Sequence, residues 1–233
     1  MVVGLLNRFG TRRPIEEARP VEADRRVESE SVSHTKAFQK FIACLAGRPA
    51  PVVLDVGPVV GSNIAYFGEH LGCKIHVADL YADLERAIHD ASPGGFVQQA
   101  RQRLALPDAS VDGVLCWDLL DYLERDAART VAAELTRLLR VNGALLGFFH
   151  PIPEREAFYV KHIVVDDATL THRRYGASRV RQGGLQNRDV IKLFEGLRVS
   201  DSFLLKTNVR EILFRKPSYL AGGGLERRAP EHR

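Results

Sequence analysis

Short, mostly apolar runs alternate along the chain with segments in which apolar residues recur every three or four positions. Runs of this length and composition are typical of parallel strands that are covered on both faces. We interpret five of them as strands of one sheet, at 52–56, 74–78, 96–99, 111–117 and 144–149. The neighbouring segments have helical spacing and predict helices at 33–47, 62–71, 81–90 and 126–140. This alternation predicts a twisted, mostly parallel sheet with helices on both faces.

The end of the chain departs from the alternation. After a helix predicted at 187–195, two strands at 197–205 and 209–216 are joined by only Lys206–Asn208. A parallel crossover needs a longer connection, so these two strands must pair antiparallel. The predicted fold is an α/β, Rossmann-like, seven-stranded and mostly parallel twisted sheet that ends in a C-terminal antiparallel hairpin.

The other segments divide the chain into three parts. Residues 1–33 mix six arginines with six acids and lack apolar periodicity, which predicts a mobile N-terminal arm. Residues 34–217 hold the α/β domain, with an excursion at 157–182 that we expect to be β-rich and to turn at Asp166-Asp167. Residues 218–233 contain three consecutive glycines and scattered charges, which predict a disordered tail.

The composition is that of an ordinary globular protein. The 233 residues are 45% hydrophobic and 27% charged, enough to bury the core of one domain. No apolar run approaches the roughly 18–20 residues of a membrane helix, and the first nine residues do not have the flanks of a secretory signal. The three cysteines lack metal-type spacing, and we interpret them as reduced thiols. We therefore expect a cytoplasmic protein with neither a membrane partner nor a metal.

Most of the formal net charge of +4 lies in one segment. Residues 154–188 hold seven basic side chains against four acidic ones. Such a patch either attracts an anionic partner, for example a small acidic metabolite, or forms a solvated face. Nucleic acid fits less well, because only Tyr159 and Tyr175 place aromatic rings between the charges.

The loop after the run at 52–56 is the first candidate site, because open α/β sheets bind ligands beyond the carboxyl ends of their strands. It reads Asp55-Val56-Gly57-Pro58-Val59-Val60-Gly61. This stretch resembles the first motif of the class I S-adenosylmethionine-dependent methyltransferases, an acidic residue in a strand followed by a G-x-G-x-G loop. The resemblance implies that Asp55, Gly57, Pro58 and Gly61 bind the cofactor. The alternative is a helix-capping turn that binds nothing.

A second acidic residue lies in register with this loop. Asp79 ends the second predicted strand, 22 residues after Gly57. A carboxylate there can accept hydrogen bonds from both ribose hydroxyls of a nucleoside cofactor, with Leu80 beside it. The alternative is an acid at a helix N-terminus, favoured by the helix dipole.

Two later stretches extend the resemblance. Residues 104–120 are similar to the family's turn and fourth strand, and residues 134–146 to the following helix, turn and fifth strand. Order and spacing agree over about residues 35–216, as in a methyltransferase type 11 domain. The resemblance implies methyl transfer from S-adenosyl-L-methionine to an acceptor that the sequence does not identify. It also implies that Trp117 either flanks the adenine or packs in the core.

The sequence departs from the family pattern at two positions. Val59 stands where the middle glycine of the loop is expected, and the segment before Pro107 offers Gln99 where the family has an acid that contacts the adenine. An amide also accepts hydrogen bonds, so Gln99 is a candidate for that role. The departures motivate an alternative function, a catalytically weak or inactive methyltransferase-like module for binding or scaffolding. A nicotinamide-dependent oxidoreductase is disfavoured by the terminal hairpin and the absence of G-x-G-x-x-G.

Candidate catalytic residues follow the fourth and fifth predicted strands. His150 is placed to act as a base if the acceptor is a hydroxyl, and Asp118 and Tyr122 border the same edge of the sheet. Each has a structural alternative, since His150-Pro151 can simply end a strand, Asp118 can cap a helix and Tyr122 can pack in the core. A small-molecule acceptor is the expected partner.

Overall fold

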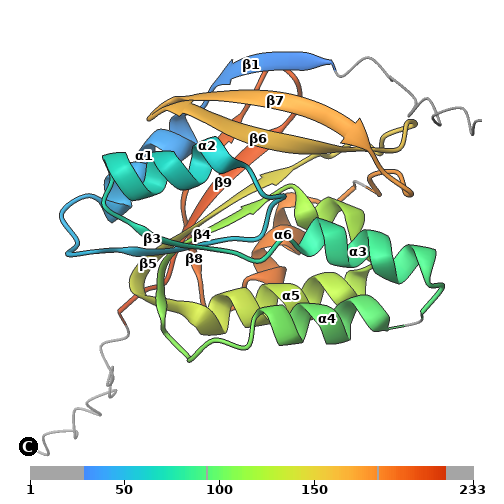
Figure 1. The fold of residues 1–233 in the computed structure, drawn as a ribbon, viewed down its shortest axis with the longest axis horizontal. Coiled ribbons are helices and arrows are strands. Elements are labelled where there is room, and N and C mark those ends of the chain that lie inside the picture. Colours follow the sequence, from blue (N-terminus) through green and yellow to red (C-terminus); the bar gives the residue numbers. More distant parts are fainter. Residues whose placement is uncertain (1–28, 93, 183, 219–233) are drawn as a thin grey trace, which may run out of the picture.

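The computed structural model describes residues 29–92, 94–182 and 184–218, and its centre is a six-stranded sheet in the order β3-β2-β4-β5-β9-β8 (Figure 1). The strands are β2 (Val52–Asp55), β3 (Lys74–Val77), β4 (Val111–Trp117), β5 (Leu139–Phe149), β8 (Arg198–Leu204) and β9 (Arg210–Arg215). The first four pair in parallel, whereas β9 is antiparallel to both β5 and β8. The predicted fold class, including the C-terminal hairpin, is confirmed.

Helices cover both faces of this sheet (Figure 1). They are α1 (Lys36–Leu45), α2 (Gly61–Ala65) with the π-helical turn η1 (Tyr66–His70), α3 (Leu80–His89), α4 (Gly95–Arg103), the 3-10 turn η2 (Leu119–Tyr122), α5 (Arg125–Leu138) and α6 (Asn187–Leu193). One apolar core lies between the sheet and α3 to α6, and a second lies between the sheet, α1 and η1. In the described part of the chain, no helix combines the length and apolar character that a membrane crossing requires.

The strand predicted at Phe96–Gln99 is wrong, because this segment lies within α4. Its buried residues Phe96, Ala100 and Leu104 recur every fourth position, which is helical spacing. Gly94 precedes the helix with φ of +74°, a left-handed conformation that glycine adopts without strain. The central sheet therefore has six described strands in place of the seven that we expected.

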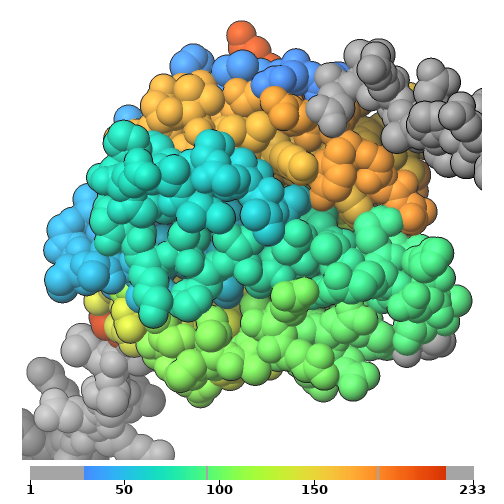
Figure 2. Space-filling model, viewed as in Figure 1, coloured from blue at the N-terminus to red at the C-terminus, as the bar shows by residue number. Residues whose placement is uncertain are grey.

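A second, three-stranded antiparallel sheet packs beside the first, in the order β1-β7-β6 (Figure 1). β6 (Phe158–Asp166) and β7 (Thr169–Gly176) form the hairpin predicted for the excursion, and Figure 2 shows their orange surface along one side of the molecule. The added strand β1 (Glu30–His34) lies partly in the segment predicted as a mobile arm. Residues 1–28 of that arm and residues 219–233 of the predicted tail lie outside the described residues.

Asn63 of α2 fastens the second sheet over the first. Its buried side chain donates to the carbonyl oxygen of His162 and accepts from the backbone N–H of Val164, both at 2.8 Å. The backbone N–H of Thr35 also donates to Ala168 at the tip of the hairpin, at 2.8 Å. These bonds hold β6 and β7 above the carboxyl ends of the parallel strands.

Candidate active site

Two cavities lie at the carboxyl edge of the parallel strands, where open α/β sheets bind their ligands. The first, which we call the loop cavity, has a volume of about 230 Å³ and borders Pro58, Val59 and Asp79 after β2 and β3. The second, the histidine cavity, has a volume of about 310 Å³ and lies between the second sheet and the ends of β4 and β5. His150, His162 and His172 line it.

The carboxylate of Asp55 organises the loop that follows β2. Its Oδ1 accepts a hydrogen bond of 2.8 Å from the backbone N–H of Gly57 and one of 2.7 Å from the indole N–H of Trp117. Burial raises the pKa of Asp55 to about 6, and both hydrogen bonds act in the opposite direction because they stabilise the carboxylate. The structure thus brings together three of the residues that the sequence assigned to the cofactor.

The Trp117 ring leaves no room for a side chain at position 57 in this conformation. A Cβ at Gly57 would lie 2.7 Å from Cδ1 of Trp117 and 2.9 Å from Oδ1 of Asp55, closer than van der Waals contact allows. Gly61 has no such neighbour, since a Cβ there would meet nothing within 4 Å. Val59, the departure from the family loop, is 57% exposed and lines the loop cavity.

Asp79 lines the loop cavity and also caps α3. Its Oδ1 accepts from the backbone N–H of Ala82 at 3.1 Å, and its φ is +43°. One carboxylate oxygen of Asp79 therefore caps the helix, as the alternative interpretation expected. The residue also borders the loop cavity. Leu80, in contrast, is fully buried in the core, and only its backbone N–H, which donates to Val56, bonds near the loop.

Gln99 does not border the loop cavity. It was assigned by its position before Pro107 in the family pattern, and the structure places it inside α4. Its buried Oε1 has no hydrogen-bond partner among the described residues.

Asp118 is fully buried at the end of β4 and is surrounded by donors. Its Oδ1 accepts from the Tyr81 hydroxyl at 2.7 Å and lies 3.2 Å from Nε2 of His162, and its Oδ2 accepts from Arg181 at 2.8 Å. Although burial alone would raise the pKa of Asp118, the His162 hydrogen bond and the Arg181 charge hold it well below its usual range. Asp118 is thus a permanent anion at the histidine cavity.

The other two candidate catalytic residues have different surroundings. Oδ2 of Asp121 lies 2.9 Å from Nδ1 of His150 and also accepts from the His150 backbone N–H at 2.8 Å, which fixes the ring at the cavity wall. Burial raises the pKa of Asp121. The hydroxyl of the buried Tyr122 donates to the carbonyl oxygen of Phe158 at 2.8 Å, so that it fastens the hairpin.

Comparison with known proteins finds a match to a family model. Residues 54–147, from β2 into β5, match the model described as a methyltransferase domain. The match covers 94 of the 233 residues. This confirms the resemblance of the sequence motifs to the class I S-adenosylmethionine-dependent enzymes, and no curated protein matches the chain.

Several solved methyltransferase structures are similar. The 1,6-didemethyltoxoflavin-N1-methyltransferase of Burkholderia thailandensis is 21% identical, with 78% of this chain and 79% of that one covered and a TM-score of 0.45. The CcbJ methyltransferase of Streptomyces caelestis is 15% identical, with 78% and 89% covered and a TM-score of 0.46. A protein from Pyrococcus horikoshii OT3 is 15% identical, with 78% and 94% covered and a TM-score of 0.46.

The groups at the loop cavity suit a nucleoside with an amino-acid arm. Asp79 and Glu85 supply carboxylates, Lys161 supplies a cation, and Tyr159 and Tyr175 supply aromatic surface. These chemical types fit ribose hydroxyls, a zwitterion and a base. The volume of about 230 Å³ lies below the roughly 300–1,000 Å³ of common ligand pockets, so the ligand needs local widening.

His162, His172 and Arg181 line the histidine cavity but are not among the site residues predicted from the sequence. The signal was available in the predicted hairpin, because a turn near 166–168 places His162 opposite His172, the register that the structure shows. Arg181 was counted only as part of the basic segment. It is buried beside Asp118, and that location depends on a long-range contact that no local pattern reveals.

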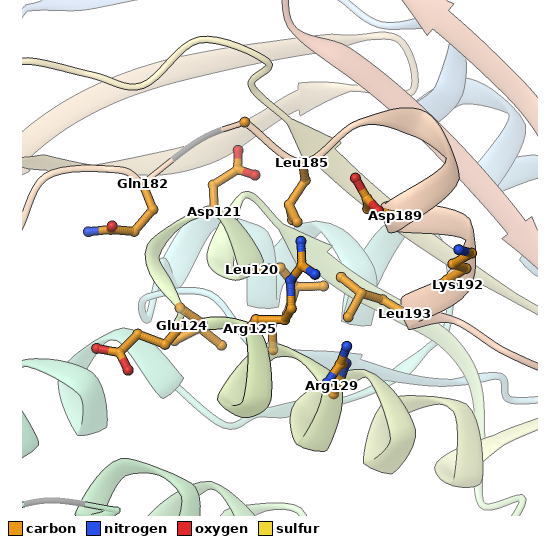
Figure 3. A pocket seen from close by; sticks show the side chains of 13 residues that line it. Leu120, Asp121, Glu124, Arg125, Arg129, Gln182, Leu185, Asp189, Lys192 and Leu193 are labelled. Atoms are coloured by element: carbon orange, nitrogen blue, oxygen red, sulfur yellow. The ribbon is translucent and has the colours of Figure 1, made fainter.

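A third cavity of about 360 Å³ lies on the other side of Asp121, between α5 and α6. Figure 3 shows Arg125 and Arg129 of α5 beside Lys192 of α6, with the Asp121 carboxylate above them. It does not border the glycine loop of the methyltransferase domain.

Proposed function

We propose that this methyltransferase binds S-adenosyl-L-methionine in the loop cavity and a small acceptor in the histidine cavity. The observation that carries the proposal is the position of Trp117 between the two. Its indole N–H donates to Asp55 of the loop, and its ring stacks on His162 of the histidine cavity, with centroids 4.8 Å apart and planes 11° apart. When bound, the cofactor supplies a methyl group on a sulfonium.

The residues of the loop cavity would hold the cofactor. Asp79 accepts hydrogen bonds from the ribose through the carboxylate oxygen that does not cap α3. Pro58 approaches the ligand, and Lys161 faces its carboxylate. Gly57 does not line this cavity and instead lies against Trp117 and Asp55. The exposed side chain of Val59 can move aside, which widens the cavity at little cost.

The histidine cavity would hold and orient the acceptor. His150, fixed by Asp121, offers a ring nitrogen to a polar group of the acceptor. Arg174 lines the same cavity and favours an acceptor with an anionic group, such as a small acidic metabolite. The second sheet forms one wall of this cavity.

One observation favours the alternative of a weak or inactive binding module. The Trp117 ring contacts Gly57 so closely that the loop is already occupied on that side, and the loop cavity is small. An active enzyme requires the loop cavity to widen when the cofactor binds, whereas an inactive module keeps the conformation of this structure.

Methyl transfer itself distinguishes the two functions. Purified protein is incubated with S-adenosylmethionine carrying a labelled methyl group and with fractionated pools of small metabolites, and labelled products are separated. We expect a labelled small molecule in an acidic fraction, absent with Asp79→Asn protein. Cofactor binding without any labelled product from any pool would favour the binding module.

A further inference from the structure

Four side chains from four elements form a continuous hydrogen-bonded chain at the histidine cavity. The hydroxyl oxygen of Ser33 in β1 lies 2.6 Å from Nε2 of His172 in β7. Nδ1 of His172 lies 2.9 Å from Nδ1 of His162 in β6. Nε2 of His162 lies 3.2 Å from Oδ1 of Asp118 after β4. The described residues hold no group of three or more His, Cys, Asp and Glu side chains placed to hold a metal ion.

The anion at one end fixes the direction of every hydrogen bond. Ionised Asp118 only accepts, so Nε2 of His162 must carry a proton. Neutral His162 then has an unprotonated Nδ1, which can only accept from Nδ1–H of His172. Nε2 of neutral His172 is therefore also unprotonated, and it accepts the hydrogen of the Ser33 hydroxyl. Both tautomers are thus assigned from the hydrogen bonds.

His162, at the far end of the chain, lies between a carboxylate and an aromatic face. An imidazolium at His162 would lie beside the Asp118 carboxylate and over the face of the Trp117 ring, two favourable contacts for a cation. His172 in the middle stays neutral, because burial and the neighbouring His162 lower its pKa to about 3. The other charged groups at this cavity are His150, Glu154, Arg174, Arg181 and Glu211.

We propose that Ser33, His172, His162 and Asp118 form a proton relay that removes the proton of a hydroxyl acceptor in the histidine cavity. This inference rests on the proposed function and narrows the acceptor to an alcohol or phenol, which needs a base to react as an oxygen nucleophile. It assigns the role of base to the relay and leaves His150 to orient the acceptor.

The proposed step balances in atoms, protons and electrons. The acceptor oxygen bonds to the methyl carbon while the carbon–sulfur bond breaks and its electron pair stays on sulfur. The acceptor proton moves to Oγ of Ser33, the Ser33 proton moves to Nε2 of His172, and the Nδ1 proton of His172 moves to Nδ1 of His162. The positive charge lost by the sulfonium appears on His162, next to Asp118.

Nuclear magnetic resonance of the full chain, labelled with ¹⁵N in its histidine rings, tests the relay without any acceptor. At about pH 8, we expect His172 to be neutral with its proton on Nδ1. Ser33→Ala should shift the Nε2 resonance of His172. Ser200→Ala, at an exposed position of β8 that lines neither cavity, should leave it in place. A His172 ring that carries its proton on Nε2, or that titrates near its ordinary pKa, would overturn the proposal.

Turnover of pooled hydroxyl compounds with labelled S-adenosylmethionine tests the chemistry. Ser33→Ala should lower the rate by about 10²–10⁴-fold with unchanged affinity for S-adenosylhomocysteine, and Ser33→Thr, which keeps the hydroxyl, should restore it. Equal rates for Ser33→Ala and Ser200→Ala would refute the relay alone. If the wild-type protein does not bind S-adenosylhomocysteine, the proposed function fails and the relay has no acceptor to serve.

Discussion

Replacing Trp117 by phenylalanine removes one hydrogen bond from a buried carboxylate and keeps an aromatic ring in place. Asp55 is only 2% exposed, and its pKa of about 6 reflects burial opposed by hydrogen bonds from Gly57 and Trp117. Because the folded pKa lies above the ordinary value of 3.8, the folded chain binds more protons between these pH values. The contribution of Asp55 to stability therefore falls as the pH rises from about 4 to about 6.

Trp117→Phe should show a further decrease in unfolding free energy at higher pH. A hydrogen bond to a charged group is worth about 1.5–3 kcal/mol, and one to a neutral group about 0.5–1.5 kcal/mol. At about pH 5 Asp55 is mostly protonated, whereas at about pH 8 it is ionised in the wild-type protein. We expect Trp117→Phe to lose about 1 kcal/mol more unfolding free energy at the higher pH, since the packing loss is the same at both.

Chemical unfolding followed by circular dichroism measures this difference, because Trp117 is the chain's one tryptophan and the variant loses its fluorescence. Phe148→Leu is the control, since Phe148 packs against the Trp117 ring at 5.6 Å without bonding to Asp55. His162 also touches Trp117, so the comparison is repeated in an Asp55→Asn background.

Equal losses at the two pH values would refute the reasoning, because the indole would then not bond to an ionised Asp55. A pH dependence that survives in the Asp55→Asn background would assign the effect to His162.

Four further outcomes are expected. Asp79→Asn keeps the helix cap and tolerates the positive φ, so it should weaken S-adenosylhomocysteine binding by at least about tenfold in calorimetry, with little change in unfolding. Gly57→Ala should destabilise the chain by about 1–3 kcal/mol in chemical unfolding, whereas Gly61→Ala should be nearly neutral. Arg174→Glu should raise the KM for an acidic acceptor and weaken its salt dependence, with cofactor affinity unchanged. His150→Gln should lower turnover less than Ser33→Ala, because it removes an orienting contact and not the relay.

The alternation of apolar runs and helical stripes was sufficient to predict the central sheet. β4 was predicted with its observed bounds, and the three-residue connection before β9 required the antiparallel hairpin. The strand prediction at 96–99 was wrong because four residues are too few to distinguish a strand period of 2 from a helix period of 3.6. The buried residues that reveal the helical period, Ala100 and Leu104, lie after this segment. β1 could not be predicted, since its exposed, polar residues form a strand only through pairing with β7.

The candidate site shows the same division between local and long-range information. Asp55, Gly57 and Asp79 follow strands and could be found from motif spacing. The pairing of Trp117 with Asp55 and the location of Ser33 beside His172 join segments 62 and 139 residues apart. Only the folded chain brings them together. The hairpin supplies two histidines to a cavity whose other wall is the sheet edge, and neither wall alone indicates a site.

Titration of the wild-type protein with S-adenosylhomocysteine, followed by calorimetry and by the fluorescence of Trp117, tests the central claim most directly. We predict saturable binding of one ligand per chain and a change in fluorescence, because the Trp117 indole bonds to Asp55 at the start of the loop that borders the cavity. NAD should cause neither effect. Absence of binding, or equal binding of NAD, would contradict the assignment of the loop cavity to S-adenosylmethionine.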